Sequence, residues 1–246
     1  MGRKPAYESD LAYIHDRGYG AFATGAAPGL LKVLQQCGIR EGLLVDLGCG
    51  SGIWARKLVD SRYRVIGVDI SPAMIELARQ RVPEARFHVG SFVQFPIPAC
   101  RAVTALGEVF NYLFDPNNSL RTLRQVCKRV FDALTPNGLL IFDVAEPGRC
   151  KGFGQRFTEG EDWTCLVEYR QDVAKQQLIR RIISFRKIGD TYRRQEETHI
   201  QQLYSGTKIA EMLREIGFRV RRVRSYGKYR LSPGVAAFVA RKPRAR

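Results

Sequence analysis

Apolar runs and amphipathic stretches alternate along the first 145 residues of the chain. Apolar runs of strand length predict buried strands, and stretches with apolar residues at helical spacing predict helices. Strands are expected at 43–46, 64–69, 85–89, 100–106 and 139–144. Helices are expected at 54–59, from residue 71 onward and at 118–134. Because strands that alternate with helices pair in parallel through crossovers, the pattern predicts an α/β fold with a doubly wound sheet.

The second part of the chain departs from this alternation. Three segments alternate polar and apolar residues, as antiparallel strands do, at 163–169, 179–185 and 192–204. Gly189-Asp190 predicts a hairpin turn between the last two. A helix and two closing antiparallel strands are expected after them, at 207–216, 218–223 and 235–240. The inserted sheet should lie above the carboxyl ends of the parallel strands, where ligands bind in such folds, so we expect a lid or a dimerisation element.

A glycine-rich turn follows the first strand, in the sequence Asp46-Leu47-Gly48-Cys49-Gly50-Ser51-Gly52. Glycines permit positive φ angles and let a ligand lie against the backbone, and the free N–H groups of the next helix favour an electron-rich group. The dinucleotide motif G-x-G-x-x-G would require glycine at position 53, where this chain has Ile53. The turn therefore predicts a nucleotide-type site that does not follow the NAD pattern.

The second strand ends at Asp69, an acid placed to accept hydrogen bonds from two ribose hydroxyls. Ser71 and Pro72 then supply an N-cap and a first helical residue. The glycine turn, Asp69 and Ser71-Pro72-Ala73-Met74, at this spacing, resemble the class I S-adenosylmethionine-dependent methyltransferases. The resemblance covers nearly the whole chain apart from the insertion. It implies a Rossmann-like seven-stranded sheet, methyltransferase activity and S-adenosylmethionine as the cofactor.

The resemblance also implies which residues contact the cofactor. They follow the ends of the first four strands: Asp46, Gly48, Cys49, Gly50, Asp69, Ile70, Met74, Ser91, Phe92 and Leu106. Ser91 departs from the family pattern, because many members carry an acid there that holds the adenine amino group. A hydroxyl puts that contact in doubt, whereas Phe92 is expected to pack on the adenine face.

The insertion and the stretch 199–204, HIQQLY, resemble more loosely the amino-sugar N-methyltransferases and N,N-dimethyltransferases. This second resemblance implies an amine as methyl acceptor. An amine must lose its proton before it attacks, and Glu108 or His199 is predicted to bind the ammonium or to take that proton. For His199 a structural role is the alternative. Asn111 and Tyr112 are expected to line the acceptor pocket. For Asn111, a role in forming a turn is the alternative.

The amino-terminal segment is rich in aromatic residues: Tyr7, Tyr13, Tyr19 and Phe22. Two interpretations are equally supported by the sequence. The segment either folds over the cofactor, as such segments do in similar enzymes, or forms a helix whose aromatic stripe packs on the core.

Composition fits one ordinary domain with a subdomain, because 246 residues that are 45% hydrophobic can bury a full core. We expect a cofactor-binding core from 1–148, the insertion at 149–205 and a closing segment at 206–246. The absence of a long apolar run and of a signal pattern predicts a cytoplasmic protein without a membrane partner. The six cysteines include no C-x-x-C pair, so neither a metal site nor a disulfide framework is predicted.

The chain is strongly basic, with a net charge of +16. Most of the excess follows residue 150, where 22 Lys and Arg stand against 10 Asp and Glu, compared with 18 and 14 before it. A basic surface can bind nucleic acid through its phosphates. The simpler explanation is a solvated edge strand that resists aggregation, since four arginines fall in or directly after one predicted strand: Arg219, Arg221, Arg222 and Arg224.

The sequence therefore predicts transfer of a methyl group from S-adenosylmethionine to a nitrogen, less favourably an oxygen, of a small metabolite. The first alternative is an RNA-modifying methyltransferase that uses the basic carboxyl-terminal region. Against it, the fourth strand ends in EVFNY at 108–112 and not in the Asn/Asp-Pro-Pro-Tyr/Phe signature of base methylation. The second alternative is a non-catalytic cofactor-binding protein. A homodimer is left open.

Overall fold

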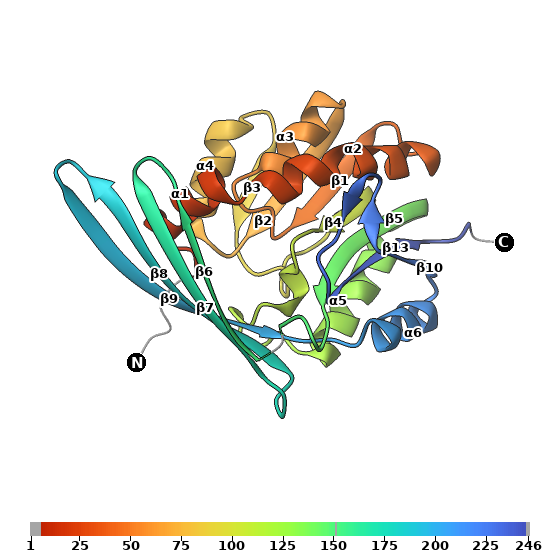
Figure 1. The fold of residues 1–246 in the computed structure, drawn as a ribbon. Coiled ribbons are helices and arrows are strands. Elements are labelled where there is room, and N and C mark those ends of the chain that lie inside the picture. Colours follow the sequence, from red (N-terminus) through yellow and green to blue (C-terminus); the bar gives the residue numbers. More distant parts are fainter. Residues whose placement is uncertain (1–5, 151, 245–246) are drawn as a thin grey trace.

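The computed structural model describes residues 6–150 and 152–244, and a seven-stranded sheet lies at its centre (Figure 1). The strand order is β10-β13-β5-β4-β1-β2-β3. Neighbours from β3 to β5 pair in parallel, and β13 is antiparallel to both β5 and β10. The strands are β1 Gly42–Leu47, β2 Tyr63–Asp69, β3 Arg86–Val89, β4 Cys100–Ala105, β5 Leu134–Ala145, β10 Arg219–Val223 and β13 Val235–Arg241. This arrangement confirms the predicted Rossmann-like, doubly wound fold.

Helices cover both faces of the sheet, with α2 to α4 on one face and α5 and α6 on the other (Figure 1). Successive residues of a strand point to opposite faces, so Leu44 packs with Leu30 of α2 while Val45 packs with Leu123 of α5. The helices are α1 Ser9–Gly18, α2 Ala21–Gln36, α3 Ile53–Asp60, α4 Pro72–Arg81, α5 Leu120–Ala133 and α6 Gly206–Ile216. Both faces of the parallel strands are therefore buried, which leaves the strand ends as the exposed edge.

The fifth strand begins earlier than the sequence predicts. Pro136-Asn137-Gly138 suggests a turn, but β5 already starts at Leu134, directly after α5. The pairing with β4 shifts between Cys100 and Ala102, so residues 135–138 bulge out of the ladder. Asn137 takes a positive φ of 65° there, and its N–H donates to the carbonyl oxygen of Lys242 over 3.0 Å. These turn-forming residues therefore serve a bulge within the strand.

The insertion forms a separate four-stranded antiparallel sheet, with strand order β6-β7-β8-β9. Its strands are β6 Phe153–Glu159, β7 Trp163–Asp172, β8 Gln177–Ile188 and β9 Thr191–Gln202. The hairpin at 189–190 and the antiparallel character are confirmed. The sequence predicts three strands and misses β6, because that edge strand is exposed along most of its length and shows little alternation. The sequence also does not predict three other elements: the helix α2, the 3-10 turn η1 at Val109–Asn111, and a small hairpin of β11 Ser225–Tyr226 with β12 Tyr229–Arg230.

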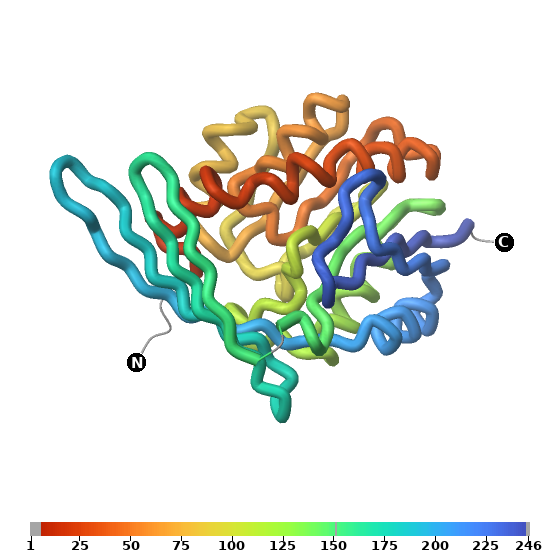
Figure 2. The backbone as a smooth tube through the Cα atoms, in the orientation of Figure 1, coloured from red at the N-terminus to blue at the C-terminus, as the bar shows by residue number. Residues whose placement is uncertain are grey.

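Figure 2 shows the long hairpins of this sheet projecting past the central sheet, with the amino-terminal helix along their inner side. Leu11 and Ile14 of α1 pack there against Trp163, Cys165 and Ile182. The insertion thus holds α1 in place over the ends of the parallel strands. In the part of the chain that the structure describes, no helix combines the length and apolarity needed to cross a membrane.

Candidate active site

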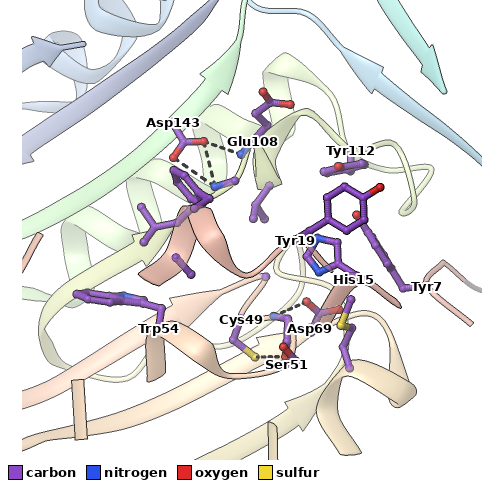
Figure 3. Close-up of a pocket in the computed structure, with 18 of the residues that line it drawn as sticks. Tyr7, His15, Tyr19, Cys49, Ser51, Trp54, Asp69, Glu108, Tyr112 and Asp143 are labelled. Atoms are coloured by element: carbon purple, nitrogen blue, oxygen red, sulfur yellow. Dashed lines mark hydrogen bonds between the residues drawn. The ribbon is translucent and has the colours of Figure 1, made fainter. Parts of the chain in front are cut away.

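A cavity of about 440 Å³ lies at the carboxyl ends of the parallel strands, between the glycine-rich turn and α1 (Figure 3). The sequence predicts ten cofactor contacts, and all ten residues line this cavity: Asp46, Gly48, Cys49, Gly50, Asp69, Ile70, Met74, Ser91, Phe92 and Leu106. The volume is within the range of small-molecule sites. Topology therefore brings the predicted residues to one place, as expected for ends of neighbouring parallel strands.

The glycine-rich turn needs its glycines for two different reasons. Gly48 and Gly50 have φ angles of 68° and 53°, in the left-handed region that favours glycine. A Cβ on Gly48 would lie 2.5 Å from Val109, so the turn could not pack there. A Cβ on Gly50 would meet no described atom within 4 Å, because that position opens onto the cavity. Gly50 therefore leaves bare backbone where a ligand can lie.

Asp69 holds the turn and the following helix together. Its Oδ2 accepts a hydrogen bond from the N–H of Gly50, and its Oδ1 accepts one from the N–H of Ser71, both over 2.9 Å. Ser71 in turn caps α4 by accepting from the N–H of Met74 over 3.1 Å. Burial raises the pKa of Asp69, and the backbone N–H groups oppose that rise. Each carboxylate oxygen has a second lone pair, so both can still accept from ribose hydroxyls.

The side chain of Asp46 forms hydrogen bonds within the protein that the sequence does not predict. Its Oδ1 accepts from the hydroxyl of Thr104 over 2.6 Å, and that hydroxyl accepts from the indole N–H of Trp54 over 3.2 Å. Burial raises the pKa of Asp46 to about 7. Its described contacts hold β1, β4 and α3 together beneath the glycine-rich turn.

Glu108 lies on the side of the cavity away from Asp69 (Figure 3). Its backbone adopts a left-handed conformation with a φ of 62°, and Asp143 holds it there by accepting from the N–H of Glu108 over 2.6 Å. The carboxylate of Glu108 accepts from Arg149 over 2.9 Å, from Arg180 over 3.1 Å and from Gln201 over 3.0 Å. Burial raises the pKa of Glu108, but Arg180 and Arg149 outweigh burial and lower the pKa below its usual value.

The structure does not bring His199 into the cavity lining, so far as the described residues define it. His199 is buried, its Nε2 lies 2.8 Å from Oε2 of Glu197, and its ring contacts the rings of Tyr7 and Phe114. Glu197 also accepts from the backbone N–H groups of Tyr7 and Glu8, over 2.8 and 2.9 Å. This placement favours the structural alternative, in which His199 and Glu197 anchor the amino-terminal segment.

Asn111 is likewise not brought into the described lining, whereas Tyr112 is. The fully buried side chain of Asn111 donates to the carbonyl oxygens of Ala145 and Gln202 over 3.0 and 2.6 Å and accepts from the N–H of Ala145. Asn111 thus joins the end of β5 to the end of β9. Tyr112 faces the cavity, and its hydroxyl accepts from Arg180 over 3.0 Å.

The amino-terminal aromatic residues combine both predicted behaviours. Tyr7, Tyr19 and Phe22 line the cavity, and Tyr13 instead packs under the guanidinium of Arg186, 3.8 Å from the ring centroid. His15, to which the sequence assigns no role, lines the cavity and stacks on Tyr19. Burial lowers the pKa of His15 to about 4, so its ring is neutral at physiological pH.

Three arginines that the sequence did not single out also line the cavity: Arg149, Arg156 and Arg180. They come from the loop after β5, from β6 and from β8. Side chains alternate between the two faces of β8, and this alternation is only a weak indication that Arg180 points to the site. The contacts of Glu108 with Arg149 and Arg180 join residues far apart in the sequence, so no local pattern predicts them.

A family model described as a methyltransferase domain matches residues 44–138. A putative methyltransferase of Bacillus subtilis (strain 168) is 28% identical over 196 residues, which is 74% of this chain and 76% of the relative. The chain is an S-adenosylmethionine-dependent methyltransferase. Its cofactor is therefore S-adenosylmethionine.

One relative and one solved structure carry names that state a sugar as the methyl acceptor. The dTDP-3-amino-3,6-dideoxy-alpha-D-glucopyranose N,N-dimethyltransferase of Streptomyces fradiae is 29% identical over 99 residues, 39% of each chain. The X-ray structure of a sugar N-methyltransferase from Streptoalloteichus sp has a TM-score of 0.80 at 18% identity, covering 99% of this chain and 96% of that one. At that identity the second likeness shows a shared fold.

The residues of the cavity fit the cofactor of the methyltransferase. The open position at Gly50 leaves room against the backbone, and the two oxygens of Asp69 suit a ribose diol. The aromatic rings of Tyr7, Tyr19 and Tyr112 line the same space and suit a sulfonium cation, because the face of an aromatic ring attracts positive charge. We propose that Asp69 holds the ribose and that the glycine-rich turn holds the methionine part.

Proposed function

We propose that this methyltransferase methylates a nitrogen of a small metabolite, with an oxygen as the less favoured target. The volume of the cavity is the observation that carries this proposal. A space of about 440 Å³ that also holds the cofactor suits a small acceptor. The amino-sugar N,N-dimethyltransferase among the relatives supports nitrogen as the target.

Pairing of the basic residues also supports a small acceptor over RNA. In the carboxyl-terminal third, Arg181 pairs with Glu168 and Glu196, and Arg193 pairs with Asp10. Arg181 and Arg193 are therefore already bound to carboxylates of the protein and are not free to take up phosphates of RNA.

S-adenosylmethionine supplies a methyl group that is already activated, so the protein must mainly align the acceptor and exclude water. Tyr7 and Tyr112 wall the cavity, and α1 covers it. Glu108 is a weak candidate for the base, because its oxygens already accept from Arg149, Arg180 and Gln201 and its pKa is lowered. We propose that Glu108 positions the two arginines, and that an amine acceptor reaches the site with its nitrogen unprotonated.

Replacing Glu108 by glutamine separates positioning from proton removal. A positioning role predicts a higher KM for the acceptor and a loss of turnover that does not change with pH. A base would instead cost about 10² to 10⁴ in turnover, with a loss that grows as pH falls. Cofactor affinity, measured by calorimetry, should stay unchanged in either case.

The domain boundaries expected from the sequence belong to the same proposal. We propose that 149–205 acts as a lid on a core made of 1–148 and 206–246. The lid role is supported by Glu197, which lies on β9 and holds the backbone of Tyr7 at the cavity. Opening the insertion would release this anchor and with it the cover over the site.

The function is tested by S-adenosylhomocysteine release on a panel of small amines, phenols, carboxylic acids and structured RNA. Mass spectrometry of the products then locates the added methyl group. We expect turnover on one or more small amines and none on RNA. Methylation of RNA alone would contradict the proposal, and methylation of oxygen alone would restrict it to the less favoured target. No release with any acceptor, despite tight cofactor binding, would favour the non-catalytic alternative.

A further inference from the structure

One wall of the cavity carries an excess of positive charge. Arg149 and Arg180 line it, and both form ion pairs with Glu108. Arg156 also lines the cavity. Asp143 forms no ion pair with these arginines in the described residues, and its oxygens accept from the N–H groups of Gly107 and Glu108 and from the hydroxyl of Tyr226. Arg149, Arg180 and Glu108 together therefore carry a net charge of +1.

The guanidinium groups retain free hydrogen-bonding capacity. Arg149 donates to Glu108 from Nε and to the carbonyl oxygen of Pro233 from Nη1, and Arg180 donates to Glu108 and to the hydroxyl of Tyr112 from its two Nη atoms. A guanidinium carries five N–H donors, so each arginine can bind a further acceptor. About a quarter of each side chain is exposed, 25% for Arg149 and 22% for Arg180. Both can therefore reach a molecule in the cavity.

We propose that Arg149 and Arg180, held in place by Glu108, bind an anionic group of the methyl acceptor, either a carboxylate or a phosphate. This inference rests on the proposed function, since it specifies the substrate of the same cavity. Guanidinium groups match the planar, paired oxygens of such anions and stay charged at every physiological pH. Two arginines around one carboxylate leave one uncompensated positive charge, which an anionic substrate would neutralise.

The same charges argue against capture of an ammonium group by Glu108. An ammonium beside Glu108 would lie within a few ångströms of two guanidinium groups, and like charges at that distance repel. The acceptor is therefore recognised by its anionic end, and its nucleophile lies elsewhere in the cavity. Glu108, with which both arginines pair, lies away from Asp69 in Figure 3.

Calorimetric titration of the S-adenosylhomocysteine-saturated protein tests the proposal without methyl transfer. The probes are malonate in one arm and inorganic phosphate in the other, which separates a carboxylate site from a phosphate site. We expect one of them to bind in the millimolar range or better, and Arg180→Met to weaken it at least tenfold. Arg181→Met is the matched control, because Arg181 is the next residue of β8 and pairs on the opposite face with Glu168 and Glu196. It should bind as the wild type does.

Equal anion binding by wild type and Arg180→Met, or no binding of either probe, would overturn the proposal. A tenfold loss of S-adenosylhomocysteine affinity in Arg180→Met would also overturn it, because the arginine would then serve the carboxylate of the cofactor. Arg180→Lys guards against misfolding, since it keeps the charge and should retain part of the binding. If the anion binds but no small amine is methylated, the proposed function fails while the anion site stands.

Discussion

Replacing Asp69 by asparagine is expected to weaken cofactor binding with little effect on the fold. Asparagine keeps the shape of the side chain and one carbonyl oxygen, so it can still accept from either Gly50 or Ser71 but not from both. The negative charge that would receive the ribose hydroxyls is lost. A hydrogen bond to a charged group contributes on the order of 1.5 to 3 kcal/mol, which is about a 10- to 150-fold change in Kd.

Titration calorimetry with S-adenosylhomocysteine measures this change directly. Glu76→Gln is the matched control, because it removes one carboxylate from the exposed surface of α4, where Gln80 is its partner. Thermal unfolding of both variants shows whether α4 and its cap survive. An unchanged Kd in Asp69→Asn with an intact fold would refute the assignment of Asp69 to the ribose. Tight binding of NAD by the wild type would refute the cofactor site as a whole.

Three further variants test other parts of the structure. Gly50→Val should abolish S-adenosylhomocysteine binding in calorimetry, because the new side chain projects into the cavity. Gly189→Val is its control: it imposes a similar left-handed strain in an exposed hairpin and should bind S-adenosylhomocysteine normally. Glu197→Ala should destabilise the protein by about 1 to 3 kcal/mol in denaturant unfolding and speed proteolysis before α1, because two partly buried N–H groups lose their acceptor. Glu196→Ala, on the other face of the same strand, should do neither. His15 has a folded pKa of about 4 against an ordinary value of 6.5, so the unfolded chain takes up the proton first and wild-type stability should fall as pH drops from 6.5 towards 4. His15→Gln should lose that part of the slope, and an identical pH profile in both proteins would contradict the burial of this ring.

Local patterns were sufficient for the cofactor half of the site. The glycine-rich turn, Asp69 and the Ser71 cap are each encoded by neighbouring residues, and parallel strands bring their carboxyl ends to one edge by geometry alone. The ten predicted contacts therefore line one cavity.

The acceptor half could not be predicted in the same way. The environment of Glu108 depends on Arg149, Arg180 and Gln201, which lie 41, 72 and 93 residues away in the sequence. His199 illustrates the converse, because its residue type suggested chemistry while its contacts with Glu197 and Tyr7 are structural. Which face of an inserted strand points to the site depends on the docking of the whole sheet, and sequence alternation does not determine that docking.

A crystal structure of the protein with S-adenosylhomocysteine bound tests the central claim most directly. The account predicts the ribose hydroxyls within hydrogen-bond distance of both oxygens of Asp69 and the amino-acid part against Gly48 and Gly50. It also predicts the sulfur turned towards the ring of Tyr112. A ligand bound outside the cavity, or one whose carboxylate occupies Arg149 and Arg180, would contradict the account.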